Sequence, residues 1–327
     1  MNSSNTQMKA VTIPEFGEAE VLRVEQTPVP EPGPGQVAID VAYAGANFAE
    51  VLYRRGVVDV PLPFVPGIEV SGRIRALGEG VTDLTVGQPV AALTIVDSGG
   101  YAEVVVTSAD LVAPLDGLGI GLGVAAALPS NSTTAFLVLD RVARIEPGDR
   151  VLVHAAAGGV GSQLGQVARL LGAGRVVGTV GSEAKIETAK RFGYDEVILR
   201  DQVAGAGEFD IVVDMVGGPS RTAGLDRLAP MGRLVVMGNA SGAEDVDIPA
   251  NHLWFTNKTV SGFNLAAFAA AFPQDAGLAL RRAVQAAAQG TLRVQVAYLP
   301  LEQATEAHRR IESGRTTGKL ALAVATP

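Results

Sequence analysis

One segment of this 327-residue chain constrains its fold more than any other. An apolar run, Val151–His154, leads directly into a small-residue turn, Ala155–Gly161, and then into a helical pattern. In such a turn Gly158 lets the backbone approach a pyrophosphate, Gly161 permits close packing of helix on strand, and the free N–H groups of the helix start attract phosphate charge. Ala156 replaces the usual first glycine of G-x-G-x-x-G, but a second strand follows about twenty residues on, as a dinucleotide-binding unit requires. A glycine turn without a ligand is the alternative. The expected cofactor-binding residues of the turn are Ala156, Gly158, Gly159, Val160 and Gly161.

The end of that second strand bears on the choice between NAD and NADP. NAD enzymes place an Asp or Glu there to hold the ribose 2′-hydroxyl, whereas this chain has Gly181. The small residue, the hydroxyl of Ser182 and the ammonium of Lys185 suit a 2′-phosphate. Glu183 is the counter-argument, because it could pair with Lys185 or face the ribose, and Lys185 could also be a solvated helix lysine. We therefore expect NADPH, with Gly181, Ser182 and Lys185 around its 2′-phosphate.

The chain divides into two regions with different sequence patterns. From residue 8 to about residue 115, short β-branched runs are cut by Gly and Pro, which is typical of a compact β domain, here with one short helix near residues 47–55. After Pro129, apolar strands alternate with helices, which predicts a doubly wound parallel sheet. Residues 276–324 add two helices and two strands, and one topology returns this tail to the first domain. The length also favours two domains.

Composition excludes several kinds of chemistry. The chain has no Cys and three scattered His, so disulfides, thiolate nucleophiles and cysteine zinc sites are ruled out, and we expect no metal. With 26 basic against 34 acidic residues and no Lys/Arg block, a nucleic-acid partner is not expected. No apolar run approaches the ~20 residues of a membrane span and no signal-peptide pattern is present, which favours a cytoplasmic protein without a membrane partner. His154 lies inside an expected core strand, where a buried structural histidine is a simpler interpretation than a catalytic one.

Further cofactor neighbours are expected where other apolar runs end. Ligands bind outside the carboxyl ends of parallel strands, so residues that follow such runs are candidates. Asp214 could simply cap or turn the chain, and Trp254 with Phe255 is more simply core or a subunit interface than a substrate box. The expected cofactor neighbours from this argument are Val216, Asn239 and Phe263.

Several spaced motifs occur in order along nearly the whole chain: Gly45-Ala46-Asn47-Phe48, Pro66-Gly67-Ile68-Glu69, Gly99-Gly100-Tyr101-Ala102-Glu103, Leu128-Pro129 with Thr134-Ala135, the Ala155–Gly161 turn, and Gly318-Lys319. On these motifs the chain resembles the zinc-independent quinone oxidoreductase branch of the medium-chain dehydrogenase/reductase superfamily. The resemblance implies an α/β protein in which a GroES-like β-barrel catalytic domain, residues 8–124 and 274–327, closes on a Rossmann domain, residues 125–273, with the cofactor in the cleft. Residues 1–7 would form a flexible tail. It also implies a homodimer that pairs edge strands of two Rossmann sheets.

The resemblance also assigns site residues. Zinc-using relatives place Cys, His and a further Cys or acid at positions that match Asn47, Ile68 and Ser130, which cannot form that site. Thr134 is implied to lie against the nicotinamide half, unless it only starts a helix, and Lys319 is implied to bind the cofactor. The branch usually has Asp where Glu50 stands, and often Tyr after the Arg-x-Gly turn, where this chain has Val57 and Val58. Quinone specificity therefore stays open.

The reaction follows from what the cleft-forming segments lack. Without a metal or a clear acid pair, the acceptor must be intrinsically electrophilic, namely a quinone or another conjugated carbonyl. Hydride addition builds negative charge on the acceptor oxygen, which hydrogen-bond donors must meet. Asn47 is the candidate catalytic residue, since its amide could reach that oxygen or the nicotinamide ribose; an Asn holding a turn is the alternative. Three functions stay open: an NADPH-dependent quinone reductase, an enoyl-thioester or enone reductase of a biosynthetic pathway, and a nucleotide-binding protein with little turnover.

Overall fold

The computed structural model describes residues 6–324, which divide into two compact units that we describe separately. Among the described residues, unit 1 comprises 6–133, 265–289 and 294–324, and unit 2 comprises 134–264 and 290–293. Unit 1 thus also holds residues 125–133 and 265–273, which we expected in the Rossmann domain; the helix of residues 265–271 packs against the helix of residues 273–288. Residues 1–5 of the expected tail lie outside the described part, and Gln7 already pairs with Pro28 in the first strand.

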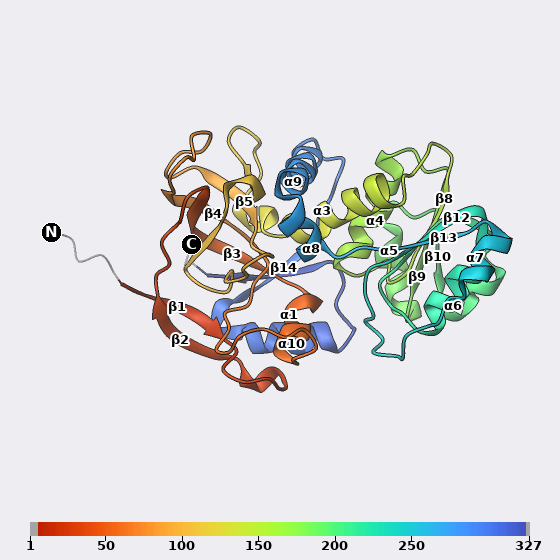
Figure 1. The fold of residues 1–327 in the computed structure, drawn as a ribbon, viewed down its shortest axis with the longest axis horizontal. Coiled ribbons are helices and arrows are strands. Elements are labelled where there is room, and N and C mark those ends of the chain that lie inside the picture. Colours follow the sequence, from red (N-terminus) through yellow and green to blue (C-terminus); the bar gives the residue numbers. More distant parts are fainter. Residues whose placement is uncertain (1–5, 325–327) are drawn as a thin grey trace. The chain divides into compact units, whose positions relative to one another are not determined.

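Unit 1 is built on β-strands (Figure 1). A seven-stranded sheet has the order β14-β15-β3-β4-β5-β7, with β6 also paired to β3, and β1 and β2 form a separate antiparallel pair. The C-terminal strand β15 pairs antiparallel with β3, so the tail does return to the first unit. The strands are β1 (Gln7–Thr12), β2 (Arg23–Pro28), β3 (Gln36–Ala46), β4 (Glu69–Leu77), β5 (Pro89–Leu93), β6 (Val104–Ser108), β7 (Val112–Pro114), β14 (Val296–Pro300) and β15 (Lys319–Ala323).

The helices of unit 1 come from both ends of its sequence. The helix expected near residues 47–55 is α1, whose N-cap is Asn47. Helix α3 begins in unit 1 and ends in unit 2. The helices are α1 (Phe48–Arg54), α2 (Leu122–Ala125), α3 (Pro129–Phe136), α8 (Leu265–Ala271), α9 (Pro273–Ala288) and α10 (Ala304–Glu312).

Unit 2 contains the doubly wound parallel sheet expected from the alternating pattern. Its six strands have the order β10-β9-β8-β11-β12-β13, and every neighbouring pair is parallel. The order reverses between β8 and β11, which is the switch point where ligands bind in such sheets. The strands are β8 (Arg150–Val153), β9 (Arg175–Val180), β10 (Glu196–Leu199), β11 (Phe209–Asp214), β12 (Leu228–Val236) and β13 (Thr259–Gly262), and the helices are α4 (Gly159–Leu170), α5 (Ile186–Lys190), α6 (Pro219–Asp226) and α7 (Ala250–Thr256).

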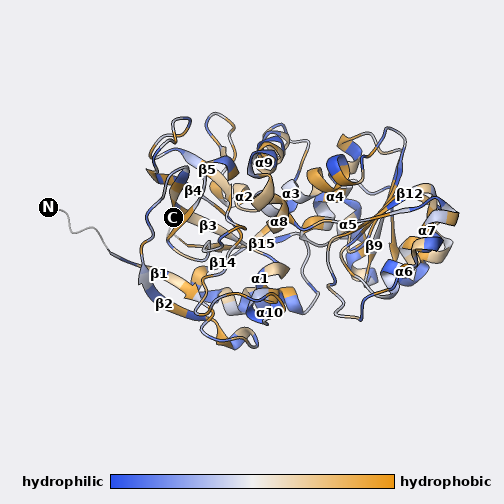
Figure 2. Cartoon of the chain, in the orientation of Figure 1, coloured by the Kyte–Doolittle hydropathy of each residue, from blue (hydrophilic) through white to orange (hydrophobic). Residues whose placement is uncertain are grey.

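Burial of the central strands holds this sheet together. The three residues Val151–Val153 of β8 and the three residues 211–213 of β11 are fully buried, and Figure 2 draws the sheet strands of unit 2 mainly in the hydrophobic colours. Each such side chain contributes about 1.5–3 kcal/mol on leaving water. The strands therefore form a rigid support for the loops at their carboxyl ends. No helix among residues 6–324 has both the length and the apolar character needed to cross a bilayer.

Candidate active site

The turn between β8 and α4 has the geometry of a phosphate cradle, and it explains the missing first glycine. The left-handed backbone conformation falls on Ala155, with φ +55°, and not on Ala156, so an alanine at position 156 is tolerated. A β-carbon on Gly161 would lie 2.2 Å from the Ala155 carbonyl oxygen, whereas one on Gly158 would lie 3.3 Å from it. Gly158 is the N-cap of α4 and has no side chain to occupy the N–H groups of the first turn. These groups are placed to bind an anion.

A Gly161→Ala substitution should therefore disturb the fold of unit 2. The added methyl group would meet backbone at 2.2 Å, and overpacking of this kind costs about 1–3 kcal/mol. We expect Gly161→Ala to lower the thermal unfolding temperature of unit 2 by several degrees and Gly158→Ala to leave it nearly unchanged. Differential scanning calorimetry of the cofactor-free variants measures this, and equal losses for the two variants would contradict the assigned geometry.

Two cationic side chains, Lys185 and Arg200, lie near the ends of β9 and β10. Lys185 ends the short 3₁₀ helix η4 (Glu183–Lys185) and is half-buried, and its pKa is lowered by burial and by the neighbouring charge of Arg200. A β-carbon on Gly181 would lie 3.3 Å from the Arg200 guanidinium. Ser182 and Glu183 are exposed beside them. The mutual repulsion of two cations would be relieved by an anionic ligand.

Arg200 was missed by sequence reasoning, although a signal for it existed. It follows Leu199, the last residue of β10, just as Asn239 and Phe263 follow other strands. Pairing of Leu199 with Val180 brings the end of β10 beside the end of β9, and with it Arg200 beside Gly181.

The loops after β11 and β12 come together at the same edge of the sheet. Asp214 caps its own turn: it accepts hydrogen bonds from the backbone N–H groups of Val216 (2.9 Å) and Gly217 (3.0 Å) and from Arg221 (2.9 Å). The Asn239 side chain lies over Gly217, where a β-carbon would be 2.2 Å from Asn239 Oδ1. The capping alternative for Asp214 is therefore confirmed.

Phe263 continues β13 at this edge, since its backbone N–H donates to Val236 O at 2.9 Å. The structure thus gathers the expected cofactor residues of unit 2 along one edge of the sheet, with the exception of Thr134. Thr134 is buried and is the sixth residue of α3, so the alternative that it only starts a helix is wrong.

His154 is a buried structural residue, as expected. Its ring is fully buried beside Thr179, with Nδ1 and Oγ1 2.9 Å apart. Burial lowers its pKa to about 4, with a smaller lowering from Arg200, so the ring is neutral at neutral pH. His308 in unit 1 is similar: burial, and then the charge of Arg54, lower its pKa to about 3.

These two histidines should make the protein acid-sensitive. The pKa values of His154 and His308 in the folded protein lie below the unfolded value of 6.5, so the unfolded chain binds these protons first as the pH falls. The contribution of the two neutral rings to the free energy of unfolding is therefore complete above pH 6.5 and is lost as the pH falls toward 4. Glu50 opposes part of the trend, because burial raises its pKa to about 7. Each proton that one state binds and the other does not changes the free energy of unfolding by about 1.4 kcal/mol per pH unit. Urea unfolding from pH 4.5 to 7.5 should show a shallower dependence for His154→Gln than for the exposed control His252→Gln; equal slopes would contradict the assignment.

In unit 1, Asn47 lies in a buried polar network. Its amide Nδ2 donates to Glu69 Oε1 at 2.9 Å and lies 3.4 Å from Glu50 Oε1, and its Oδ1 accepts from the ammonium of Lys319. The same ammonium pairs with Glu69. Lys319, which we expected to bind the cofactor, is 3% exposed, and its ammonium is bonded to Asn47 and Glu69.

This network includes Asn47, Ile68 and Ser130, the positions that by the sequence resemblance match the zinc ligands of zinc-using relatives. Glu69 links Asn47 to Ser130, whose backbone N–H donates to Glu69 Oε2 at 2.7 Å, and Ile68 N donates to Glu50. Among residues 6–324 there is no group of three or more His, Asp or Glu side chains arranged to hold a metal ion. The amide, alkyl and hydroxyl groups at these positions do not fit zinc.

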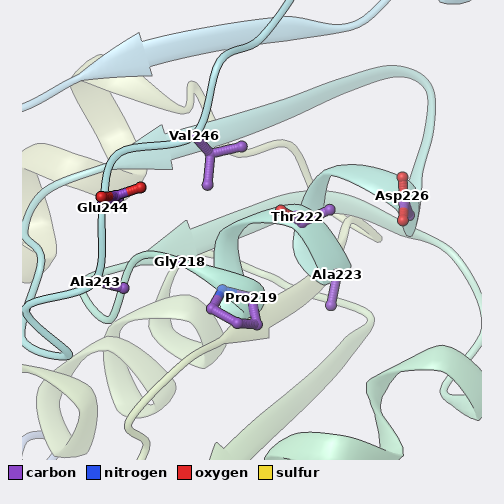
Figure 3. Close-up of a pocket in the computed structure, with 8 residues that line it drawn as sticks. All are labelled: Gly218, Pro219, Thr222, Ala223, Asp226, Ala243, Glu244 and Val246. Carbon is purple, nitrogen blue, oxygen red and sulfur yellow. The ribbon is translucent and has the colours of Figure 1, made fainter.

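A separate hollow lies beside α6 (Figure 3). Thr222, Ala223 and Asp226 line it from the helix, and Glu244 and Val246 line it from the loop after β12. Its lining residues include two acids and no cation, so it does not suit a phosphate, and we assign it no role.

Comparisons with known proteins agree with this fold. Residues 33–117 match the family described as alcohol dehydrogenase GroES-like domain, and residues 159–281 match the family described as zinc-binding dehydrogenase. A probable quinone oxidoreductase of Schizosaccharomyces pombe is 33% identical over 95% of this chain and 96% of its own length. The solved Escherichia coli quinone oxidoreductase complexed with NADPH aligns with TM-score 0.88 at 28% identity, over 97% of this chain and all of the other. A structure named as an NAD-dependent alcohol dehydrogenase aligns with TM-score 0.84 at 32% identity over the same shares.

A GroES-like unit joined to a Rossmann unit, with these motifs in order, defines a medium-chain dehydrogenase/reductase. Within that superfamily the chain belongs to the quinone oxidoreductase family.

Proposed function

We propose that the protein is a zinc-free, NADPH-dependent oxidoreductase that transfers hydride to a quinone or another conjugated carbonyl compound. The observation that carries this proposal is the carboxyl edge of the unit 2 sheet, where the uncapped start of α4 lies next to the strand end that bears Lys185 and Arg200. The binding of NADPH by the Escherichia coli relative supports the same choice.

The residues of unit 2 suit this cofactor. The first-turn N–H groups of α4 would bind the pyrophosphate, and Gly158 leaves room for it. Lys185 and Arg200 would bind the 2′-phosphate, and Asn239 and Phe263 would lie along the dinucleotide. When bound, NADPH supplies the hydride.

The choice of acceptor follows from the Asn47 network. Oxidation of an alcohol needs a metal or a base to remove the hydroxyl proton, and the zinc positions of this chain carry Asn47, Ile68 and Ser130. Reduction of a conjugated carbonyl needs only charge stabilisation at one oxygen, which amide or ammonium groups can provide. Val57 and Val58, which stand where related quinone oxidoreductases often have Tyr, are both exposed. By the resemblance they line the substrate side, so substrates other than quinones stay possible.

A panel assay tests the proposal. NADPH oxidation is followed with 1,4-naphthoquinone, with 2-cyclohexen-1-one and with crotonyl-CoA, each with and without EDTA, and zinc is measured by elemental analysis. Turnover of the quinone in EDTA supports the proposal, and turnover of crotonyl-CoA alone would favour the enoyl-thioester reductase. NADPH binding without any turnover would favour the nucleotide-binding protein, and one zinc per chain with activity lost on its removal would overturn the mechanism.

We also propose that the protein forms a homodimer through the edge of the unit 2 sheet. Strand β13 is the last strand of that sheet, and the preceding α7 carries the stacked pair Trp254 and Phe255, which are 70% and 74% exposed. An edge strand beside exposed aromatic side chains is a common protein interface.

Loss of these rings should weaken the dimer. Truncation of central aromatic residues costs about 2–4 kcal/mol, so Trp254→Ala/Phe255→Ala should raise the dimer dissociation constant at least about thirtyfold. Light scattering over a dilution series measures this, with Tyr298→Ala, which removes an exposed ring of unit 1, as the control. A monomeric wild-type protein, or equal dissociation of both variants, would contradict the proposal.

A further inference from the structure

Three ionisable side chains surround Asn47 in unit 1, and they come from three separate elements. Glu50 lies in α1, Glu69 begins β4 and Lys319 begins β15. Both glutamates are fully buried and Lys319 is 3% exposed, whereas Asn47 is only half-buried. Asn47 is thus the member of the network that retains an accessible surface.

The chemistry of the partners determines which way the Asn47 amide points. An ammonium can only donate hydrogen bonds and an ionised carboxylate can only accept them. Because the Lys319 ammonium contacts one end of the amide and Glu69 Oε1 contacts the other end, the end at Lys319 must be the oxygen and the end at Glu69 must be the nitrogen. The reversed amide would place like groups together at both contacts.

The backbone holds the two charged partners in place. Pairing of Leu320 with Ala46 brings the preceding residue, Lys319, next to Asn47 at the end of the β3–β15 ladder. Glu69 is held at its other oxygen by the Ser130 N–H, and it packs so closely on Gly45 that a β-carbon there would lie 2.4 Å from Glu69 Oε1. A buried ion pair is weak evidence for a stability role, since apolar groups of similar size would serve as well.

We propose that Lys319 and Glu69 are positioning residues, which hold the Asn47 amide in a single orientation for its work on the nicotinamide ribose or the acceptor oxygen. Lys319 then acts through Asn47 and not by direct contact with the cofactor. This inference rests on the proposed function, which gives Asn47 that work.

The test is a double-mutant cycle on the full-length protein. Lys319→Met alone would leave the Glu69 carboxylate buried without its ammonium and could destabilise the fold, so the principal variant is Lys319→Met/Glu69→Gln, which removes both charges and keeps the side-chain volumes similar. It is compared with Asn47→Ala and with the triple variant. Arg233→Met/Asp149→Asn, which breaks an ion pair of 2.7 Å in unit 2, is the control for stability.

We expect Lys319→Met/Glu69→Gln to lower kcat with 1,4-naphthoquinone as much as Asn47→Ala does, and the triple variant to lose no more than threefold further. The dissociation constant of NADPH, from nicotinamide fluorescence, should change by the same factor in Lys319→Met/Glu69→Gln as in Asn47→Ala, whichever of the two contacts Asn47 makes. Losses that multiply in the triple variant, or NADPH binding weakened at least tenfold beyond that of Asn47→Ala, would show that Lys319 acts independently and overturn the inference.

A second measurement needs no turnover. In cofactor-free protein labelled with 15N-asparagine, the side-chain N–H protons of Asn47, assigned by their loss in Asn47→Ala, should exchange slowly with solvent, and at least tenfold faster in Lys319→Met/Glu69→Gln. Equal exchange rates would overturn the inference by themselves. A wild-type protein that reduces none of the acceptors would defeat the proposed function, and the exchange rates would still show whether the two charged residues order the amide.

Discussion

Replacement of both Lys185 and Arg200 by alanine is expected to abolish a strong preference for NADPH over NADH. A hydrogen bond between a cation and a phosphate contributes about 1.5–3 kcal/mol, so two of them amount to about 3–6 kcal/mol, or roughly a hundredfold to ten-thousandfold in affinity. Lys185→Ala alone should remove about half of this free energy, because Arg200 still faces the phosphate. NADH has no 2′-phosphate, so its affinity should barely change.

Titration of nicotinamide fluorescence with both cofactors measures the preference. Lys190→Ala is the matched control, since Lys190 is an exposed lysine on the adjoining helix α5 that pairs with Glu187 at 2.6 Å. Equal NADPH and NADH affinities in the wild-type protein would sink the NADPH assignment. A preference that survives the double replacement would show that other residues, such as Ser182, select the cofactor.

Much of unit 2 could be predicted because its determinants are local. The run Val151–Val153 is apolar because the strand is buried on both faces. The glycines that follow are required by contacts within a few residues, since a β-carbon on Gly161 would lie 2.2 Å from the Ala155 carbonyl oxygen. The parallel strand order follows from the same alternation of strand and helix. The position of the strained residue could not be predicted, because the left-handed conformation falls on Ala155, an alanine.

The network around Asn47 could not be predicted because it depends on register between distant strands. Glu69 and Lys319 are separated by 250 residues and meet only because β15 pairs with β3 and β4 lies beside it. Lys319 was expected to bind the cofactor, and in the structure its amine is bonded to Asn47 and Glu69. Interactions of this kind leave no periodic signal in the sequence.

Asn47→Ala is expected to lower the turnover of conjugated acceptors by about ten- to a thousandfold, the range for loss of one donor to a developing oxyanion. If Asn47 only positions the nicotinamide ribose, the loss should appear mainly as weaker cofactor binding. In the structure the N–H groups of the Asn47 amide point to Glu69 and Glu50, and the longer 3.4 Å contact to Glu50 is the one that an acceptor oxygen could replace at least cost. Asn47→Asp is the matched variant, since it keeps the shape, removes both donors and adds a third carboxylate, and its loss should be the greater.

The same assays separate reduction from alcohol oxidation. The Asn47 network offers no metal ligands to lower the pKa of an alcohol. Glu50, whose pKa is raised to about 7 by burial, is fully buried and accepts hydrogen bonds from the backbone N–H groups of Asn47 and Ile68, so it is not placed to act as the base. Simple alcohols with NADP should therefore give no measurable rate. Deuterium supplied on C4 of NADPH should appear in the reduced 2-cyclohexen-1-one, and Asn47→Ala should slow this transfer without redirecting it. Robust alcohol oxidation by the wild-type protein would defeat this mechanism, because it requires a metal or a base that Asn47 and its three ionisable neighbours do not supply. Absence of deuterium transfer to every conjugated acceptor would defeat it as well, because reduction of such an acceptor is the reaction that the amide of Asn47 is proposed to assist.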